Sequence, residues 1–239
     1  MADALLEVAV RHARDVPGCA EGGADRLSLQ VGDDDAGSSP DLAAAASVIR
    51  ATDLPVRVVL RLGESFTTNG GEMVRLVGLA EEYVGLGAEG VCFGFLDPDL
   101  EIDEETCEAL AGSLPGIPWT FHRGFDATLD AGRSWRRVRR LPGLTAVCSG
   151  GSPAGLARGY DELIARAEAD PEVARLLMPG GGLAPEQVPW FVRAGVRQFH
   201  VAEQVRPGGT LRSYVDAEFV RSWRRMLDGA LGGGARSSA

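Results

Sequence analysis

The 239-residue sequence lacks lysine entirely, since all 24 of its basic residues are arginine. This absence excludes three classes of enzyme that depend on a lysine: Schiff-base aldolases, pyridoxal-phosphate enzymes and ATPases with a Walker A motif. Any anion that the protein binds must therefore be held by arginine, by histidine or by backbone amides.

The sequence also lacks long apolar runs, a basic-then-apolar leader and paired cysteine motifs. No apolar segment reaches about 18 residues, so no membrane-spanning helix and no membrane partner are expected. The four cysteines are far apart, with neither a CxxC pair nor a zinc-binding spacing (Cys19, Cys92, Cys107 and Cys148). In a chain of this length they are predicted to be reduced, which indicates a cytoplasmic protein.

Positive charge is in short supply, because the formal net charge is −10. A protein that binds nucleic acid through its backbone phosphates needs an excess of cationic surface, so nucleic acid is not an expected partner. A small anionic molecule is compatible with this balance, because a few arginines at one site are enough to hold it.

Eight strand-like segments alternate with helix-like segments along the chain. The predicted strands cover residues 5–10, 26–31, 56–62, 90–95, 118–123, 145–150, 175–182 and 198–202. Eight strand–helix units in one chain of this length are typical of an α/β protein with the (β/α)8 TIM-barrel fold. An open doubly wound sheet is disfavoured, because no glycine fingerprint follows the first strand. We predict a single barrel domain over residues 1–231 and a disordered tail over residues 232–239.

Alternation along each strand separates an apolar face from a polar face. Helices cover the outside of a TIM barrel, so the apolar faces are expected to point outward and the polar faces into the barrel. The polar residues predicted to point inward are Glu7, Ser28, Gln30, Arg57, Arg61, His122 and His200. Ser28, Gln30, Arg61 and His200 are accordingly predicted to contact a substrate.

The segment 119–126 delivers His122, Arg123 and Asp126 at the end of a predicted buried strand. A buried strand has no structural need for these groups, since desolvating them is costly unless they are paired. One interpretation is a hydrogen-bond network that anchors the loop. We favour the other, in which His122 and Asp126 are catalytic and Arg123 binds substrate, because active sites lie at the carboxyl ends of barrel strands.

Glu7 is predicted to be a general acid or base, since a carboxylate in a walled pocket can have its pKa tuned toward neutrality. The alternative is a buried ion-pair partner for Arg57 or Arg61. Arg61 itself is a natural clamp for a carboxylate or phosphate group.

Gly180, Gly181 and Gly182 follow the seventh predicted strand. Many TIM barrels bind phosphate there through backbone amides, which predicts a substrate-binding role. A tight turn that needs positive φ angles explains the glycines equally well, and both interpretations stay open.

Cys92 and Cys148 lie on the fourth and sixth predicted strands, whose inward side chains can share one layer of the barrel. A soft-metal site is one interpretation of this pair. Two packed apolar cysteines are the interpretation that we favour, because free cysteine behaves as a small hydrophobic residue.

Several segments share a pattern with one known protein family: residues 5–8, 23–26, 60–61, 149–150, 178–182 and 199–200, and above all the Phe-His-Arg-Gly-Phe-Asp motif at residues 121–126. On these segments, nearly the whole chain resembles the CutC copper homeostasis proteins, which are TIM barrels. It implies the barrel fold, a nominal role in copper homeostasis and a homodimer, because members of the family tend to self-associate.

Three departures from the family pattern concern its copper chemistry and its anion contacts. The family's proposed copper(I) ligands are two cysteines, at the positions of Ala9 and Gln30 in this chain. Copper(I) prefers thiolate or thioether ligands, so no copper cofactor is expected at these positions. The family's Arg-Pro-Arg-Gly-Gly loop is altered in residues 61–65, where one arginine of two is kept.

Three functions are compatible with these observations. The first is a CutC-like cytoplasmic protein of copper homeostasis. The second is a metal-independent lyase or isomerase for a small phosphorylated or carboxylated metabolite, in which Glu7 and His122 exchange protons while Arg61, Arg123 and the 180–182 amides hold the anion. The third is a barrel that only binds or oligomerises.

Overall fold

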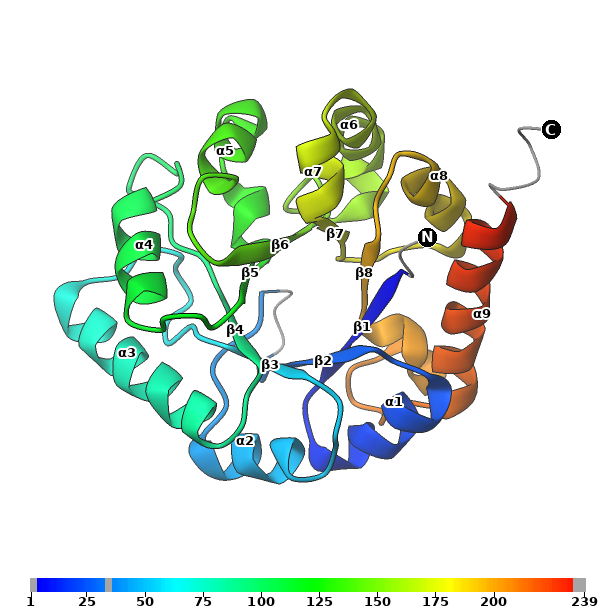
Figure 1. Ribbon diagram of the computed structural model, residues 1–239, viewed down its shortest axis with the longest axis horizontal. Coiled ribbons are helices and arrows are strands. Elements are labelled where there is room, and N and C mark those ends of the chain that lie inside the picture. Colours follow the sequence, from blue (N-terminus) through cyan, green and yellow to red (C-terminus); the bar gives the residue numbers. More distant parts are fainter. Residues whose placement is uncertain (1–3, 33–35, 234–239) are drawn as a thin grey trace.

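The computed structural model describes residues 4–32 and 36–233, which form a ring of strands surrounded by helices (Figure 1). The strands are β1 (Leu5–Val10), β2 (Arg26–Leu29), β3 (Val56–Val59), β4 (Gly90–Phe93), β5 (Trp119–Phe121), β6 (Leu144–Ser149), β7 (Leu177–Pro179) and β8 (Gln198–Val201). All seven pairings between neighbouring strands are parallel, in the order β7-β6-β5-β4-β3-β2-β1-β8. The predicted (β/α)8 barrel is confirmed.

The α-helices lie outside the ring and connect successive strands (Figure 1). They are α1 (Val16–Gly22), α2 (Leu42–Ile49), α3 (Gly70–Gly85), α4 (Glu104–Gly112), α5 (Ala131–Val138), α6 (Leu156–Ala169), α7 (Pro171–Leu176), α8 (Val188–Arg193) and α9 (Ala217–Gly233). Side chains at the helix starts accept backbone N–H groups that would otherwise lack partners. Such caps are formed by Asp41, Asn69, Asp103 and Asp130.

The barrel closes where β7 meets β8. No ladder joins these two strands among the described residues, but Gly180 directly after β7 packs against His200 of β8. A Cβ atom placed on Gly180 would lie 3.3 Å from the His200 side chain. The ring is therefore nearly closed, which brings the end of β7 beside the end of β8.

The predicted division of each strand into two faces is confirmed. The outward residues of the strands belong to one apolar core shared with the helices, in which Phe93 and Trp119 stack at 4.1 Å. The inward residues include buried Glu7, Arg26, Ser28, Arg57 and Thr120. The barrel interior is thus polar and charged, which is unusual for a fold whose interior is commonly filled by branched apolar side chains.

Several strands are shorter than predicted, β3 ending at Val59 among them, and two further differences concern helices. Arg175 and Leu176, expected in the seventh strand, belong instead to α7, because Asp170 caps a helix that begins at Pro171. α9 continues to Gly233, so the first two residues of the predicted tail are helical. The remainder of that tail, residues 234–239, lies outside the described residues.

Within residues 4–32 and 36–233, none of the helices has both the length and the apolar character needed to cross a bilayer.

Candidate functional site

A cavity lies inside the barrel near the carboxyl ends of the strands. It brings together six of the predicted site residues: Glu7, Ser28, Gln30, His122, Arg123 and His200. Its other walls are Ala36, Cys92, Cys148 and Met178. Its free space is about 10 Å³, which corresponds to room for about one ordered water. Polar side chains from β1, β2, the end of β5 and β8 therefore converge on one small chamber.

The Glu7 carboxylate is the electrostatic centre of this chamber. It accepts a hydrogen bond from Arg26 Nε at 2.5 Å, and its other oxygen lies 3.0 Å from His200 Nδ1. Both contacts follow from register, because Glu7 pairs with Arg26 across β1–β2 and with His200 across β1–β8. Glu7 is 2% exposed, so this carboxylate is shielded from water and depends on its partners.

The pKa of Glu7 is shifted away from neutrality. Burial by itself raises this pKa, but the charge of Arg26, the hydrogen bond to His200 and the charge of Arg57 outweigh burial, and the pKa lies well below its ordinary value. The prediction of a Glu7 pKa tuned toward neutrality is therefore wrong. An ionised Glu7 orients His200 through Nδ1 and leaves Nε2 as the atom available for proton transfer.

His122 ends β5 and has its ring orientation set by the backbone. Its Nδ1 accepts a hydrogen bond from Gly124 N–H at 3.1 Å, which places the proton of a neutral ring on Nε2. Phe66 packs against the ring at a centroid distance of 5.4 Å. His122 is 3% exposed, so it is held as a hydrogen-bond donor at the cavity wall.

A wider hollow of about 450 Å³ lies at the mouth of the barrel, and Arg61 and Arg123 both line it. Arg61 donates hydrogen bonds to the carbonyls of Gly37 at 2.8 Å and Glu64 at 2.5 Å, and its guanidinium lies 5.1 Å from the centre of the Phe66 ring. This hollow shares Ala36 and Arg123 with the inner cavity, and its two arginines provide positive charge that an anion could contact, beside the negative charge of Glu64.

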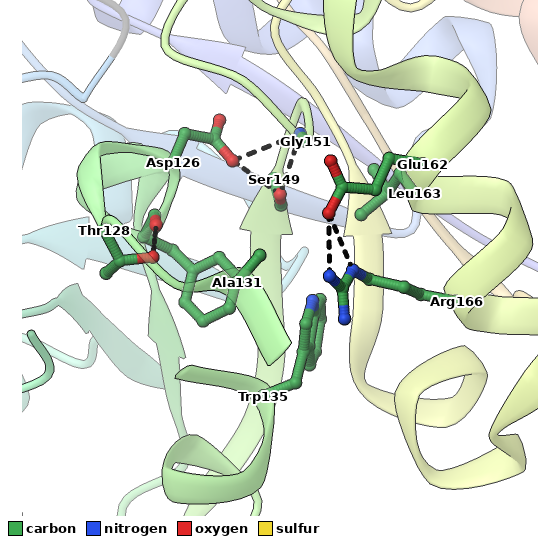
Figure 2. Close-up of a pocket in the computed structure, with 10 residues that line it drawn as sticks. Asp126, Thr128, Ala131, Trp135, Ser149, Gly151, Glu162, Leu163 and Arg166 are labelled. Carbon is green, nitrogen blue, oxygen red and sulfur yellow. Dashed lines mark hydrogen bonds and ion pairs between the residues drawn. The ribbon is translucent and has the colours of Figure 1, made fainter. Parts of the chain in front are cut away.

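Asp126 faces away from the cavity that holds the other predicted catalytic residues. Its carboxylate accepts hydrogen bonds from Arg123 Nε at 2.9 Å, from Ser149 Oγ at 2.5 Å and from the Gly150 amide at 2.8 Å. It lines a separate hollow between α5 and α6, next to Trp135 and the Glu162–Arg166 ion pair (Figure 2). Burial raises the pKa of Asp126, while Arg123, Ser149 and Gly150 lower it, and burial has the larger effect. This geometry favours a positioning role, in which Asp126 holds Arg123 at the mouth.

The glycine run after β7 forms a turn. Gly181 and Gly182 have φ angles of +78° and +84°, which side chains disfavour, so the turn interpretation is confirmed. A Cβ atom on Gly181 would lie 2.3 Å from a guanidinium nitrogen of Arg123, so the absence of a side chain lets the turn pack on that arginine. Phosphate binding by the amides of residues 180–182 stays a prediction.

We expect Gly181→Ala to destabilise the protein more than Gly182→Ala. Both substitutions impose the same positive-φ cost, about 1–2 kcal/mol. Gly182 has open space around its Cβ position, whereas Gly181 would clash with Arg123, which adds about 1–3 kcal/mol of overpacking. Urea unfolding of the two variants measures the difference. Equal losses would show that the contact between the turn and Arg123 does not constrain the mouth.

Arg57 points inward as predicted, but it lies near the amino ends of the strands, away from the barrel mouth. It donates to Thr120 Oγ1 at 2.6 Å and pairs with Glu89 at 3.0 Å, so Arg57 acts on Glu7 only through its charge, and the direct ion-pair partner of Glu7 is Arg26. Sequence reasoning missed Arg26 as the partner of Glu7. The signal was present, because Arg26 shares its strand face with Ser28 and Gln30.

The donor set at the family's copper positions does not fit copper(I). Ala9 has no donor side chain, and its carbonyl accepts a hydrogen bond from Arg206. Gln30 lines the cavity with an amide, which is a hard ligand for this metal. Across the described part of the chain, no group of three or more His, Cys, Asp or Glu side chains is placed to hold a metal ion.

Comparisons with known sequences place this architecture in a family. A sequence model described as the CutC family matches residues 4–205. A family protein CutC from Xylella fastidiosa is 32% identical over 199 residues, covering 82% of this chain and 74% of that protein. The human copper homeostasis protein cutC homolog is 30% identical over 211 residues, covering 86% of this chain and 76% of that protein.

Solved structures agree with the sequence comparison. The crystal structure of CutC from Streptococcus agalactiae superposes with a TM-score of 0.71 at 25% identity, covering 82% of this chain and 97% of that chain. Thiamine phosphate pyrophosphorylase from Pyrococcus furiosus superposes with a TM-score of 0.60 at 15% identity, covering 96% of this chain and 97% of that chain, a likeness of fold alone.

Proposed function

The chain belongs to the CutC family, and from this premise we propose that it is a cytoplasmic protein of copper homeostasis whose barrel mouth binds a small anionic metabolite and transfers protons on it. The first part of the proposal follows the name of the human relative. The second part rests on one observation: the Glu7–His200 pair, His122 and Arg123 line a single cavity at the carboxyl ends of the strands.

His200 is the proposed proton-transfer residue. Its Nδ1 lies 3.0 Å from the ionised Glu7 carboxylate, which fixes the orientation of the ring. A histidine held in this way takes a proton from a substrate through Nε2 and returns it. Glu7 is then a positioning residue rather than the acid or base that its sequence context predicts.

His122 is the proposed electrophile. Its Nδ1 accepts the Gly124 amide, so in the neutral ring Nε2 carries the proton and can donate a hydrogen bond to a substrate oxygen on which negative charge develops. A lyase or isomerase needs these two functions together, one group that moves a proton and one that stabilises an oxyanion. The arrangement requires neither a lysine nor a bound metal.

Arg61 and Arg123 are the proposed anion contacts. They line the mouth hollow, which is large enough for a small phosphorylated or carboxylated molecule. Each of the two arginines is 7% exposed. Ser28 and Gln30 line the inner cavity, whose free space of about 10 Å³ admits only the terminal atoms of a bound molecule, so their hydroxyl and amide can contact only that end of the substrate. A homodimer, and the absence of nucleic-acid and membrane partners, stay predictions.

We expect phosphate or carboxylate metabolites to raise the melting temperature of the protein, and Arg61→Ala to abolish the effect. An anion at about 100 times its Kd stabilises the folded state by about 2.7 kcal/mol. For a domain of this size that corresponds to about 5–10 °C. A thermal-shift screen measures each variant against its own anion-free melting temperature.

Arg193→Ala, at an exposed position at the end of α8, is the matched control and should keep the full shift. A shift that survives Arg61→Ala would contradict the proposed anion contact. If no anion changes the melting temperature of the unaltered protein, a non-catalytic role, in which the barrel only binds or oligomerises, becomes the better-supported function.

A further inference from the structure

We propose that the barrel interior binds one copper(I) ion between the sulfur atoms of Cys92 and Cys148, with the Met178 thioether as a third soft donor. The inference rests on the copper-homeostasis part of the proposed function and names the residues that hold the metal in this chain. These are not the two positions at which the family's cysteines are replaced by Ala9 and Gln30.

Three sulfur side chains from three strands line the same cavity. Cys148 of β6 and Met178 of β7 are register partners, so both point into the barrel, and with Ala146 they form an interior cluster separate from the main core. Cys92 reaches the cavity from β4, on the other side of β5. Gly180 leaves room for the Cys148 thiol, because a Cβ atom there would lie 2.7 Å from Sγ.

The other two cysteines have a different environment. Cys19 in α1 and Cys107 in α4 are fully buried in the apolar core between the helices and the sheet. None of the polar cavity residues surrounds them there. Cys19 and Cys107 therefore pack separately outside the barrel, whereas Cys92 and Cys148 line one polar cavity together with Met178.

The donor set selects a soft ion with a low coordination number. Thiolate and thioether ligands favour soft metals, which include copper(I), zinc and the iron of iron–sulfur clusters. A structural zinc site needs four ligands of the cysteine, histidine or carboxylate type, and the described residues offer no group of even three. Two thiolates are enough for copper(I), and the free space of about 10 Å³ suits a single ion.

The charges around the sulfur atoms are suited to an anionic complex. Burial and the charge of Glu7 raise the pKa of both thiols, while Arg57 and Arg26 lower that of Cys92 and Arg123 lowers that of Cys148. Two thiolates and one copper(I) carry a net charge of −1. The Arg26 guanidinium, which pairs with Glu7, also lies 3.6 Å from the Met178 sulfur, and Arg57 and Arg123 add positive charge near Cys92 and Cys148.

Copper(I) enters by ligand exchange. It arrives as an anionic complex with two small thiolates, which the arginines of the mouth attract. Each small thiolate leaves the metal as a thiol after taking the proton of Cys92 or Cys148, and the two protein thiolates replace it. Two copper–sulfur bonds break, two form, two protons move to the departing thiols, and no electron is transferred.

The test is an anaerobic titration of the reduced protein with copper(I) held by bicinchoninate. We expect the unaltered protein to remove one equivalent from the chelator. Cys92→Ala and Cys148→Ala should each lower the affinity by more than about 100-fold, beyond the loss expected for an outer-shell partner. Cys19→Ala and Cys107→Ala are matched controls that should bind as the unaltered protein does. Zinc should not be taken up.

X-ray absorption of the copper-loaded unaltered protein tests the ligands without any substitution. Coordination by sulfur alone supports the site, and Met178→Leu should remove one sulfur if the thioether is bound. Nitrogen or oxygen ligands in place of the two thiolates, a failure to take copper from the chelator, or copper retained by the Cys92→Ala, Cys148→Ala double variant would each overturn it.

The same proteins separate this inference from the proposed function. If copper is not bound while anions still raise the melting temperature in an Arg61-dependent manner, only the copper site is wrong. If copper is bound and no anion has an effect, the proposed anion chemistry is wrong and the copper site stands.

Discussion

Glu7→Gln should cost about 3–5 kcal/mol of folding free energy, the loss typical of a buried ion pair from which one partner is removed. The glutamine keeps the shape of the side chain but leaves Arg26, 5% exposed, without a counter-charge. It also removes the charge that faces His200. Urea unfolding followed by circular dichroism measures the loss, and the melting temperature should fall by about 10 °C.

The pH dependence of that loss has a definite sign. The folded-state pKa of Glu7 lies below its ordinary value of 4.5, so the stability contributed by its ionisation is fully present above about that pH and is lost as the pH falls through the lower folded-state pKa. The difference in unfolding free energy between the unaltered protein and Glu7→Gln should therefore be constant from about pH 7 to about pH 5. It should shrink at lower pH, where the Glu7 carboxylate becomes protonated.

Two further variants test whether the loss of stability comes from the buried ion pair. Glu172→Gln removes an exposed partner of Arg175 and should change stability by less than about 0.5 kcal/mol. Glu7→Gln combined with Arg26→Gln should recover part of the loss, because neither partner is then left as an unpaired buried charge. If Glu7→Gln loses less than about 1 kcal/mol of unfolding free energy, the buried Glu7–Arg26 ion pair does not contribute strongly to the stability of the fold.

Asp15→Ala is expected to have an equal or larger effect. Asp15 precedes α1 and forms a buried ion pair with Arg206, each side chain being 1% exposed. Its carboxylate also accepts the backbone N–H groups of Arg11, His12 and Val215. Removal leaves a buried guanidinium, which costs about 3–5 kcal/mol. Each unsatisfied amide adds about 1–3 kcal/mol.

A loss of this size approaches the whole stability of a typical domain, about 5–15 kcal/mol. We therefore expect little soluble folded Asp15→Ala, as judged by gel filtration and circular dichroism. Asp15→Asn, which keeps an accepting oxygen, should fold with an intermediate loss. Asp228→Ala is the surface control, because Arg224 retains Asp25 as its second carboxylate partner. Normal stability of Asp15→Ala would show that the Arg206 pair is dispensable.

The faces of the strands were predictable because alternation is a local property of the chain. Leu27 and Leu29 could be assigned outward, and Ser28 inward, without knowledge of any other strand. The partner of Glu7 was not predictable in this way. Its contacts with Arg26 and His200 depend on how three strands are aligned, and a shift of register would exchange them for others.

The motif at residues 121–126 shows the same limit. Its three polar residues are adjacent in sequence, which suggested one catalytic group. His122 and Arg123 line the cavity, but Asp126 turns back to Ser149 and the Gly150 amide, which come from the end of β6. The direction of each side chain depends on the short turn that follows β5 and on what the neighbouring strand offers.

The sequence by itself determined the barrel, its family, its polar interior and the exclusion of lysine chemistry, because composition and alternation carry that information locally. Only the tertiary structure decided which charges neutralise one another and that the thiols of Cys92 and Cys148 share a cavity with Met178. The physical reason is that buried charges and soft ligands act over a few ångströms, and those distances are set by strands that lie far apart in the chain.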